Sequence, residues 1–312
     1  MESGPVRMGR EKRLCKGVSM SYIDILIESA EKSGNNICMG LDPIVDVLPF
    51  KELDVAERIT KYFDTLFSKM VEEKLSPAAF KPNLGYYAAL DRPREGKFDG
   101  SIALAHVMDA LESYFPGIPV ILDSKRGDIA RSSGNYAKEA FDSWKADAVT
   151  VSPYMGSDSV LPFAFEGKGM YVLNRTSNPG SAEIQNRSML DSVDEHDVYP
   201  LYIAVSHAIV IWAEQHKGTG AVVGATNMRE FADIAKYFSG KEIPMLIPGV
   251  GSQGGSASDV MSAMADVSYD KRLARINSSS GLTHPWKKGD APSGWLDMCI
   301  SSIRALIREA SL

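Results

Sequence analysis

The residues best suited to chemistry stand directly after a short apolar run in the middle of the chain. Residues 118–122 are apolar, and the sequence then reads Asp123-Ser-Lys125-Arg-Gly-Asp128. Side chains alternate faces along an extended chain, so Asp123 and Lys125 would lie on one side, about 7 Å apart along it. A carboxylate and an ammonium aimed at one small space can stabilise developing charge and transfer a proton. The alternative is a solvated loop with an incidental ion pair.

The elements around this stretch alternate between short apolar runs and amphipathic segments with helical spacing. Buried strands are expected at residues 36–41, 78–80, 118–122, 148–151, 169–173, 220–224, 244–247 and 273–277. Helices are expected at residues 54–73, 102–114, 133–144, 198–215, 227–238 and 295–309, with one more beginning at Ser256. This alternation predicts the α/β class and a (β/α)8 TIM barrel, with an additional N-terminal helix at residues 23–30.

Length and composition fit one such domain. No composition break divides the 312 residues, so residues 19–312 are expected to form a single barrel, preceded by a mobile tail at residues 1–18. A polar stretch at 181–195 has too few apolar residues to pack, and it is expected to be an inserted loop or lid.

Charge and cysteine usage exclude several classes of protein. The net charge of −6 does not suggest a nucleic-acid surface, and no apolar run approaches the length of a membrane span. The three cysteines, Cys15, Cys38 and Cys299, have neither zinc nor disulfide spacing. A cytoplasmic protein in a reducing compartment is therefore expected.

Active sites of such barrels lie at the carboxyl ends of the strands. Those positions hold Asp42, Lys81, Asp123 with Lys125, and Thr176 with Ser177. Any one of these charges alone would indicate a surface salt bridge. Their recurrence at strand ends instead favours convergence on one barrel mouth.

The segment after the seventh expected strand is rich in glycine. Gly249, Gly251, Gly254 and Gly255 occur within seven residues, just before the helix expected at Ser256. Backbone N–H groups at a helix N-terminus bind anions, and barrels commonly bind phosphate after strands seven and eight. A flexible surface turn is the alternative, but the pattern favours a phosphorylated ligand.

Five motifs in order now amount to a resemblance. They are Gly-Leu-Asp42-Pro, Phe-Lys81-Pro-Asn83, Asp123-Ser-Lys-Arg-Gly-Asp128-Ile129, Arg-Thr176-Ser177-Asn-Pro-Gly and Pro248-Gly-Val-Gly-Ser-Gln253. Together they resemble the longer, Lys-Arg-Gly-Asp-Ile branch of the orotidine 5′-phosphate decarboxylase family, from about residue 20 to the end. The resemblance implies a carboxy-lyase of pyrimidine biosynthesis that converts orotidine 5′-phosphate to UMP without metal or organic cofactor.

The resemblance also implies roles for individual residues. Lys125 would protonate C6 of the pyrimidine, Asp123 would lie against the substrate carboxylate, and Lys81 would complete the charged array. Asp128 and Ser132 would be contributed across the interface of a homodimer. The implied substrate-binding residues are Asp42, Asn83, Ile129, Ser132, Thr176, Ser177, Pro248, Gly249, Gly251, Gln253 and Ser280.

One position departs from the family pattern. The family has Ser-Ser-Arg-Gly near the eighth strand, with the arginine binding phosphate, whereas this chain has Ser278-Ser279-Ser280-Gly281. Loss of the forked guanidinium group of that arginine removes charge-assisted hydrogen bonds worth about 1.5–3 kcal/mol each. Either a nearby cation compensates or phosphate affinity is reduced; the candidates are Arg275, Lys271 and an arginine of the 181–195 segment.

Two other functions stay open from the sequence. A sugar-phosphate decarboxylase or aldolase of the same superfamily would share Asp-x-Lys-x-x-Asp but use Mg²⁺, and glutamates near the second strand end would favour it. Lys81 occupies that place instead. Ser280 alone suggests the other alternative, a non-catalytic phosphate-binding barrel.

Overall fold

The computed structural model describes residues 14–15, 18–190, 198–250 and 255–312. Within them, eight parallel strands form one sheet, in the order β4-β3-β12-β11-β10-β7-β6-β5. The strands are β3 (Ile37–Leu41), β4 (Ala79–Pro82), β5 (Ile121–Arg126), β6 (Ala148–Val151), β7 (Gly169–Arg175), β10 (Thr219–Val223), β11 (Met245–Ile247) and β12 (Ala274–Ser278). Parallel bridges from Phe80 to Val120 and from Asn83 to Asp123 join the two edges. The sheet therefore closes into the predicted barrel.

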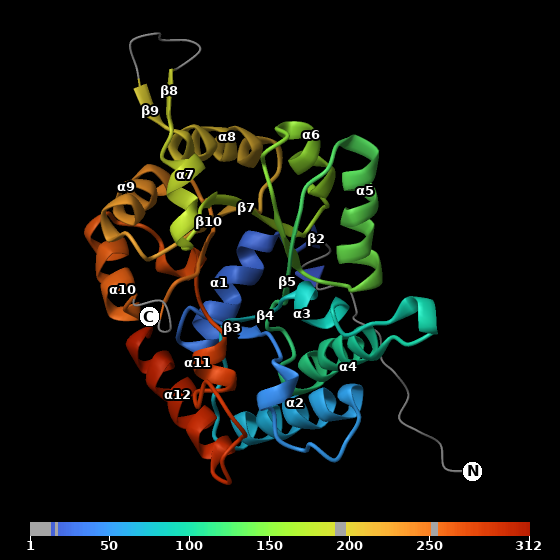
Figure 1. Ribbon diagram of the computed structural model, residues 1–312. Coiled ribbons are helices and arrows are strands. Elements are labelled where there is room, and N and C mark those ends of the chain that lie inside the picture. Colours follow the sequence, from blue (N-terminus) through green and yellow to red (C-terminus); the bar gives the residue numbers. More distant parts are fainter. Residues whose placement is uncertain (1–13, 16–17, 191–197, 251–254) are drawn as a thin grey trace.

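Helices surround the sheet, as Figure 1 shows. The longer ones are α2 (Val55–Glu72), α4 (Asp99–Tyr114), α5 (Ala130–Lys138), α8 (Leu201–Gln215), α9 (Met228–Phe238), α10 (Ala257–Asp266) and α12 (Trp295–Glu309). Short ones are α3 (Leu84–Ala88), α6 (Ser157–Val160), α7 (Ala182–Gln185) and α11 (Ser280–Thr283). Asp54, Asn227 and Ser256 cap α2, α9 and α10 by accepting hydrogen bonds from backbone N–H groups, which fixes where these helices begin.

Several element boundaries differ from the prediction. The helix expected at 198–215 begins at Leu201, because Val198–Pro200 form strand β9. The third strand was expected to end at residue 122, but β5 continues to Arg126, which pairs with Val151 after a break in register. The helix expected at 133–144 begins at Ala130 and ends in a π-helical turn, Glu139–Ser143. The charged residues and the glycine after residue 122 indicated a loop, but the pairing of Arg126 with Val151 of β6 keeps residues 123–126 in the strand.

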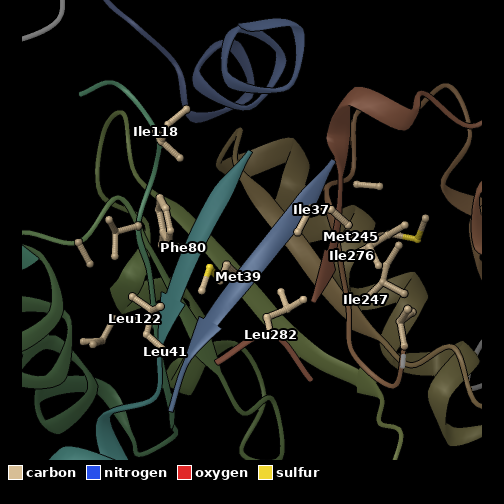
Figure 2. Packing of buried hydrophobic residues seen from close by; sticks show 14 of the residues in the cluster. Ile37, Met39, Leu41, Phe80, Ile118, Leu122, Met245, Ile247, Ile276 and Leu282 are labelled. Carbon is tan, nitrogen blue, oxygen red and sulfur yellow. The ribbon is translucent and has the colours of Figure 1, made fainter. Parts of the chain in front are cut away.

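Alternate residues of every strand of the barrel except β12, which holds the buried Arg275, enter two separate apolar layers. Met39, Leu41 and Phe80 belong to the large layer between sheet and helices, part of which Figure 2 shows. Their neighbours Cys38 and Ala79 belong to a smaller cluster inside the barrel. Full burial of one large apolar side chain is worth about 1.5–3 kcal/mol, so this alternation fixes which face of each strand points inward.

Helix α1 (Tyr22–Ser33) closes the amino-terminal end of the barrel. Ser21 and Asp24 form a capping box at its start, and Gly34 ends it with a φ of 64°. The Tyr22 hydroxyl donates to the Tyr171 hydroxyl at 3.2 Å, and both rings are fully buried. This is the additional N-terminal helix that the sequence predicts.

The 181–195 segment is more regular than expected. It contains α7 and β8 (Ser188–Leu190), which pairs antiparallel with β9 (Val198–Pro200). Residues 191–195 lie outside the described residues, and the role of the segment as an inserted loop or lid stays a prediction. In the predicted tail, Leu14–Cys15 pairs with Val18–Ser19, and the rest lies outside the described residues. Across the described ranges, no helix is long and apolar enough to cross a membrane.

Candidate active site

A cavity of about 690 Å³ opens at the carboxyl ends of the strands. This volume is in the range of small-ligand sites. Nine of the predicted site residues line it: Asp42, Lys81, Asp123, Lys125, Thr176, Ser177, Pro248, Gly249 and Ser280. The chain thus brings together residues from six strand ends.

A lysine–aspartate–lysine array lies at the base of this cavity. Lys81 Nζ donates to Asp123 Oδ2 at 2.7 Å, and Lys125 Nζ donates to Asp123 Oδ1 at 2.6 Å. The Lys81 and Asp123 side chains are almost wholly buried, whereas half of the Lys125 side chain is exposed. One ammonium is therefore fixed in the wall, and the other can reach both a bound ligand and water.

The charges in the array support one another. Burial opposes ionisation of Asp123, but Lys81 and Lys125 outweigh it and hold the pKa of Asp123 well below its usual range. Burial would lower the pKa of Lys81, yet Asp123 and Asp42 raise it above the ordinary lysine value. The carboxylate is therefore ionised and Lys81 charged at neutral pH.

The backbone bends sharply at Lys125, within β5. Its φ is +46°, which is uncommon for a residue with a side chain. The Thr150 hydroxyl accepts from the N–H groups of Ser124 and Lys125 and donates to Asp123 Oδ1 at 2.8 Å. Thr150 thus holds the bend and the carboxylate together. The two charged side chains converge through this bend rather than through the extended geometry that the sequence suggested.

Asp42, at the end of β3, faces the same cavity. Its Oδ2 accepts from the Ser279 hydroxyl at 2.7 Å, while its buried Oδ1 has no partner among the described residues. Gly40 permits the contact, because a Cβ there would lie 2.6 Å from Ser279 Cβ. The buried Asn277 Oδ1 also lacks a described partner and belongs to a residue of the cavity wall. Both oxygens are available to donors of a ligand.

Thr176 and Ser177 differ in how free their polar groups are. Gln185 Oε1 accepts from Thr176 N at 2.9 Å, Gln185 Nε2 donates to Thr176 Oγ1 at 2.9 Å, and Thr176 Oγ1 donates to Asn178. Arg175 donates to the Thr176 carbonyl. For the Ser177 hydroxyl and N–H, no hydrogen bond is present within the described residues. Ser177 is therefore the member of this pair whose polar groups can meet a ligand.

The glycine-rich segment and Ser280 form the far end of the cavity. Pro248 and Gly249 follow β11, and Ser280 is the first residue of α11. Gly249 has a φ of 96°, a conformation that favours glycine. Gly251 and Gln253 lie outside the described residues, so their predicted phosphate contacts stay predictions.

None of the three suggested cations replaces the missing arginine. Arg275 is fully buried and donates to Leu26 O and Ser29 Oγ of α1, at the opposite end of the barrel. Lys271 precedes β12 at that same end, in the turn Lys271–Leu273. Arg187 donates to the Glu183 carbonyl, and it is not part of the cavity wall. Alternation along β12 points residue 275 inward but places it below the site.

Four predicted residues lie away from the cavity wall of their own chain. Asn83 caps α3 by accepting from Gly85 N at 3.0 Å. Asp128 accepts from Ile129 N at 2.7 Å, Ile129 is 57% exposed, and Ser132 is exposed. Asp128, Ile129 and Ser132 thus stand at the surface beside the site.

Among the residues of the wall that were not predicted from the sequence are Thr150, Gln185, Asn277 and His284. Thr150 and Asn277 could have been found, because both occupy inward positions near strand ends. Gln185 lies in the segment expected to be a loop, and His284 stands one turn beyond Ser280. Across the described ranges, no group of three His, Cys, Asp or Glu side chains is arranged to hold a metal ion.

Fold and site define the class first: a (β/α)8-barrel enzyme with a charged array at the carboxyl ends of its strands. The family described as "Orotidine 5'-phosphate decarboxylase / HUMPS family" matches residues 35–283. The chain belongs to the orotidine 5′-phosphate decarboxylase family.

Individual relatives agree with this assignment. The orotidine 5′-phosphate decarboxylase of Cupriavidus metallidurans is 34% identical over 87% of this chain and 92% of its own length. That of Bordetella avium is 38% identical over 85% of this chain and 90% of its own.

Solved structures give the same result. The Leishmania donovani OMP decarboxylase superposes with a TM-score of 0.69 at 29% identity, covering 93% of this chain and 99% of the other. The UMP synthase of the same organism matches at 33% identity with a TM-score of 0.69. It covers 92% of this chain, and the chain spans 57% of that longer protein.

Proposed function

We propose that this protein decarboxylates orotidine 5′-phosphate to UMP, a step of pyrimidine biosynthesis. The observation that carries the proposal is the array itself, in which Lys81 and Lys125 hold opposite oxygens of the buried Asp123 carboxylate. The family membership and the names of the relatives support the same substrate.

Lys125 is the proton donor in this proposal. The C6–carboxylate bond breaks, CO₂ leaves, and the electron pair stays on C6, where no adjacent carbonyl delocalises it. A fixed ammonium stabilises that charge as it develops and then delivers its proton to C6. Because half of the Lys125 side chain is exposed, it can regain a proton from water after product release.

Asp123 and Lys81 set the electrostatics around that step. The Asp123 carboxylate would lie beside the carboxylate of the substrate, a repulsion that is relieved as CO₂ departs. Lys81 keeps Asp123 ionised and oriented, since its own ammonium is buried and held at 2.7 Å. The two lysines therefore have different roles: one acts on the substrate and one fixes the aspartate.

The rest of the cavity would bind the nucleotide. The unpaired Asp42 Oδ1 suits ribose hydroxyls, and Ser177 can present a hydroxyl and an N–H to the pyrimidine edge. The glycine-rich segment and Ser280 would receive the phosphate. Binding energy from the phosphate, far from C6, can then be used for orientation at the reacting carbon.

A homodimer would complete the site. Ile129, Tyr154 and Met155 are 57%, 87% and 44% exposed, and they follow the neighbouring strands β5 and β6. Exposed apolar groups at one place favour a protein interface. Asp128 and Ser132 stand among them and would reach the partner's cavity. The unpaired Cys38 and Cys299 fit the expected reducing, cytoplasmic compartment.

An absorbance assay with orotidine 5′-phosphate, run with and without EDTA, tests the proposal. We expect turnover that EDTA does not change. Loss on chelation with recovery by Mg²⁺ would instead support the metal-dependent branch of the superfamily, and UMP binding without turnover would support a non-catalytic barrel.

Lys125→Ala tests the proton donor. It should reduce kcat by about 10³-fold or more, because both charge stabilisation and proton transfer are lost. Lys217→Ala, on the exposed end of the barrel away from the cavity, is the matched control. Substantial residual kcat in a folded Lys125→Ala variant would contradict the role.

A further inference from the structure

The far end of the cavity lacks the cation that a phosphate dianion would normally meet. No lysine or arginine occurs in residues 248–256 or in residues 277–284. Among the described residues of the wall, the groups that can carry positive charge are Lys81, Lys125 and His284. Both lysines are engaged by Asp123, so His284 alone stands at the phosphate end without a carboxylate bonded to it.

His284 is placed one helical turn after Ser280. Its backbone N donates to the Ser280 carbonyl at 3.0 Å, so His284 closes the turn that begins at Ser280. His284 is the C-cap residue that follows α11, with a φ of −150° and a ψ of 67°, and it lines the same cavity as Ser280. The residue is only 2% exposed, yet it forms part of the cavity wall.

The ring is oriented by one nitrogen and leaves the other available. Nδ1 lies 2.9 Å from the oxygen of the Thr283 hydroxyl, which donates to the Ser279 carbonyl at 3.2 Å. Within the described residues Nε2 has no hydrogen-bond partner. Because the Thr283 hydroxyl donates to the Ser279 carbonyl, it accepts from Nδ1–H, and Nε2 carries no proton in the neutral ring. In the imidazolium form both nitrogens donate, so Nε2 becomes a donor when the ring is protonated beside an anion.

No carboxylate of the described residues is hydrogen-bonded to the His284 ring. Asp42, from the end of β3, is the charged group that faces it, and Trp286 packs edge-on with ring centroids 6.3 Å apart. From α2, Tyr62 donates to the Thr283 carbonyl, and from α12 the Cys299 thiol donates to the same atom. Burial lowers the pKa of His284 and Asp42 opposes this effect, so the ring is mainly neutral until an anion arrives.

We propose that His284 binds the substrate phosphate through Nε2 and takes over part of the role that an arginine at position 280 would have. This inference rests on the proposed function, because it assumes a phosphorylated ligand with its phosphate beside Ser280. It assigns a specificity role to a residue outside the five motifs that identify the family.

Calorimetric affinities for UMP and uridine separate the phosphate from the rest of the ligand. His284→Asn keeps an amide near the Nδ1 position but has nothing at Nε2. It should weaken UMP binding by about tenfold to a hundredfold while uridine binding changes little. His284→Gln restores a donor near Nε2 and should recover part of the loss. His106→Asn, on the exposed face of α4, is the control.

A second background tests the replacement itself. Ser280→Arg should tighten UMP binding, and in that background His284→Asn should cost much less than in the native chain. Equal weakening of UMP and uridine by His284→Asn would overturn the proposal, because the residue would then act on Asp42 or on packing. An undiminished cost beside Arg at 280 would also overturn it. Failure of the decarboxylase assay with normal UMP binding would reject the proposed function alone.

Discussion

At the scale of single residues, the site depends on burying charge that only its partners compensate. Asp123 and Lys81 are 6% and 5% exposed, and desolvation of each would be costly if the other were absent. Thr150 adds a hydroxyl donor to the same carboxylate and holds the left-handed turn at Lys125. Such a conformation persists only where neighbouring groups over-determine it, and here they do.

Asp123→Asn should therefore destabilise the fold at neutral pH by about 3–5 kcal/mol, because the buried Lys81 loses its counter-charge. In the native chain Lys81 and Lys125 hold the pKa of Asp123 low, and Asp123 raises the pKa of Lys81. In the variant, the pKa of Lys81 would fall below its unfolded value near 10.4, so stability of the variant should rise with pH.

In the native chain, the raised pKa of Lys81 gives stability that is fully present below the unfolded lysine pKa near 10.4. This stability is lost as the pH rises through the folded pKa of Lys81. The difference in the free energy of unfolding between the native chain and Asp123→Asn should therefore narrow between pH 7 and pH 10. Urea unfolding at both pH values measures it, and a difference independent of pH would contradict the account.

At the scale of elements, hydrogen bonds within the segment after β7 hold the turn that contains Thr176 and Ser177. Gln185, from α7, satisfies both the N–H and the hydroxyl of Thr176, and Arg175 joins it to Glu230 of α9 at 2.7 Å. Gly224 allows the turn to lie close, because a Cβ there would be 2.9 Å from Ser177 Cα. The turn that presents Ser177 is thus fixed by residues that need not touch the ligand.

Gln185→Ala should loosen this turn and weaken binding of the base. Two neutral hydrogen bonds are lost, worth about 0.5–1.5 kcal/mol each. We expect a higher KM for orotidine 5′-phosphate and weaker UMP binding, with the affinity for ribose 5-phosphate unchanged. Gln215→Ala, at the exposed end of α8, is the control. If ribose 5-phosphate weakens as much as UMP, the residue does not act through the pyrimidine turn.

At the scale of the whole molecule, one barrel holds most but not all of the proposed site. Asp128 and Ser132 lie beside the cavity rather than in its wall, and exposed apolar residues accompany them. In a two-fold dimer the same surface of both subunits forms the interface, so each subunit would contribute Asp128 and Ser132 to the cavity of the other.

Mixing two inactive variants tests this arrangement. Lys125→Ala and Asp128→Ala should each be impaired alone, because every site lacks one group. After subunit exchange, half of the dimers would be mixed and each would have one complete site, so about a quarter of native activity should return. Sedimentation should show the dimer throughout. No recovery after verified exchange would contradict a shared site.

The sequence predicted the barrel and the array because both are recorded in local patterns. Strand ends that carry Asp42, Lys81 and Asp123 recur with the strand–helix rhythm, and the inward alternation then forces them together. Contacts between distant segments were not predictable in this way. Arg275 is near Ser280 in sequence but donates to α1 at the other end of the barrel. His284 and Gln185 gain their roles only from the folding of short helices whose lengths no periodicity could reveal.

The closed barrel floor also limits molecular traffic. Tyr22, Tyr171 and Arg275 fill the interior below the array and are fully buried, so nothing passes out through the amino-terminal end. Substrate, CO₂ and nucleotide product would then pass through the opening at the carboxyl ends of the strands. CO₂ formed beneath the pyrimidine would have to diffuse past the bound nucleotide or be released after it. Turnover in such a site depends on the rate of product release as well as on the rate at which the C6–carboxylate bond breaks.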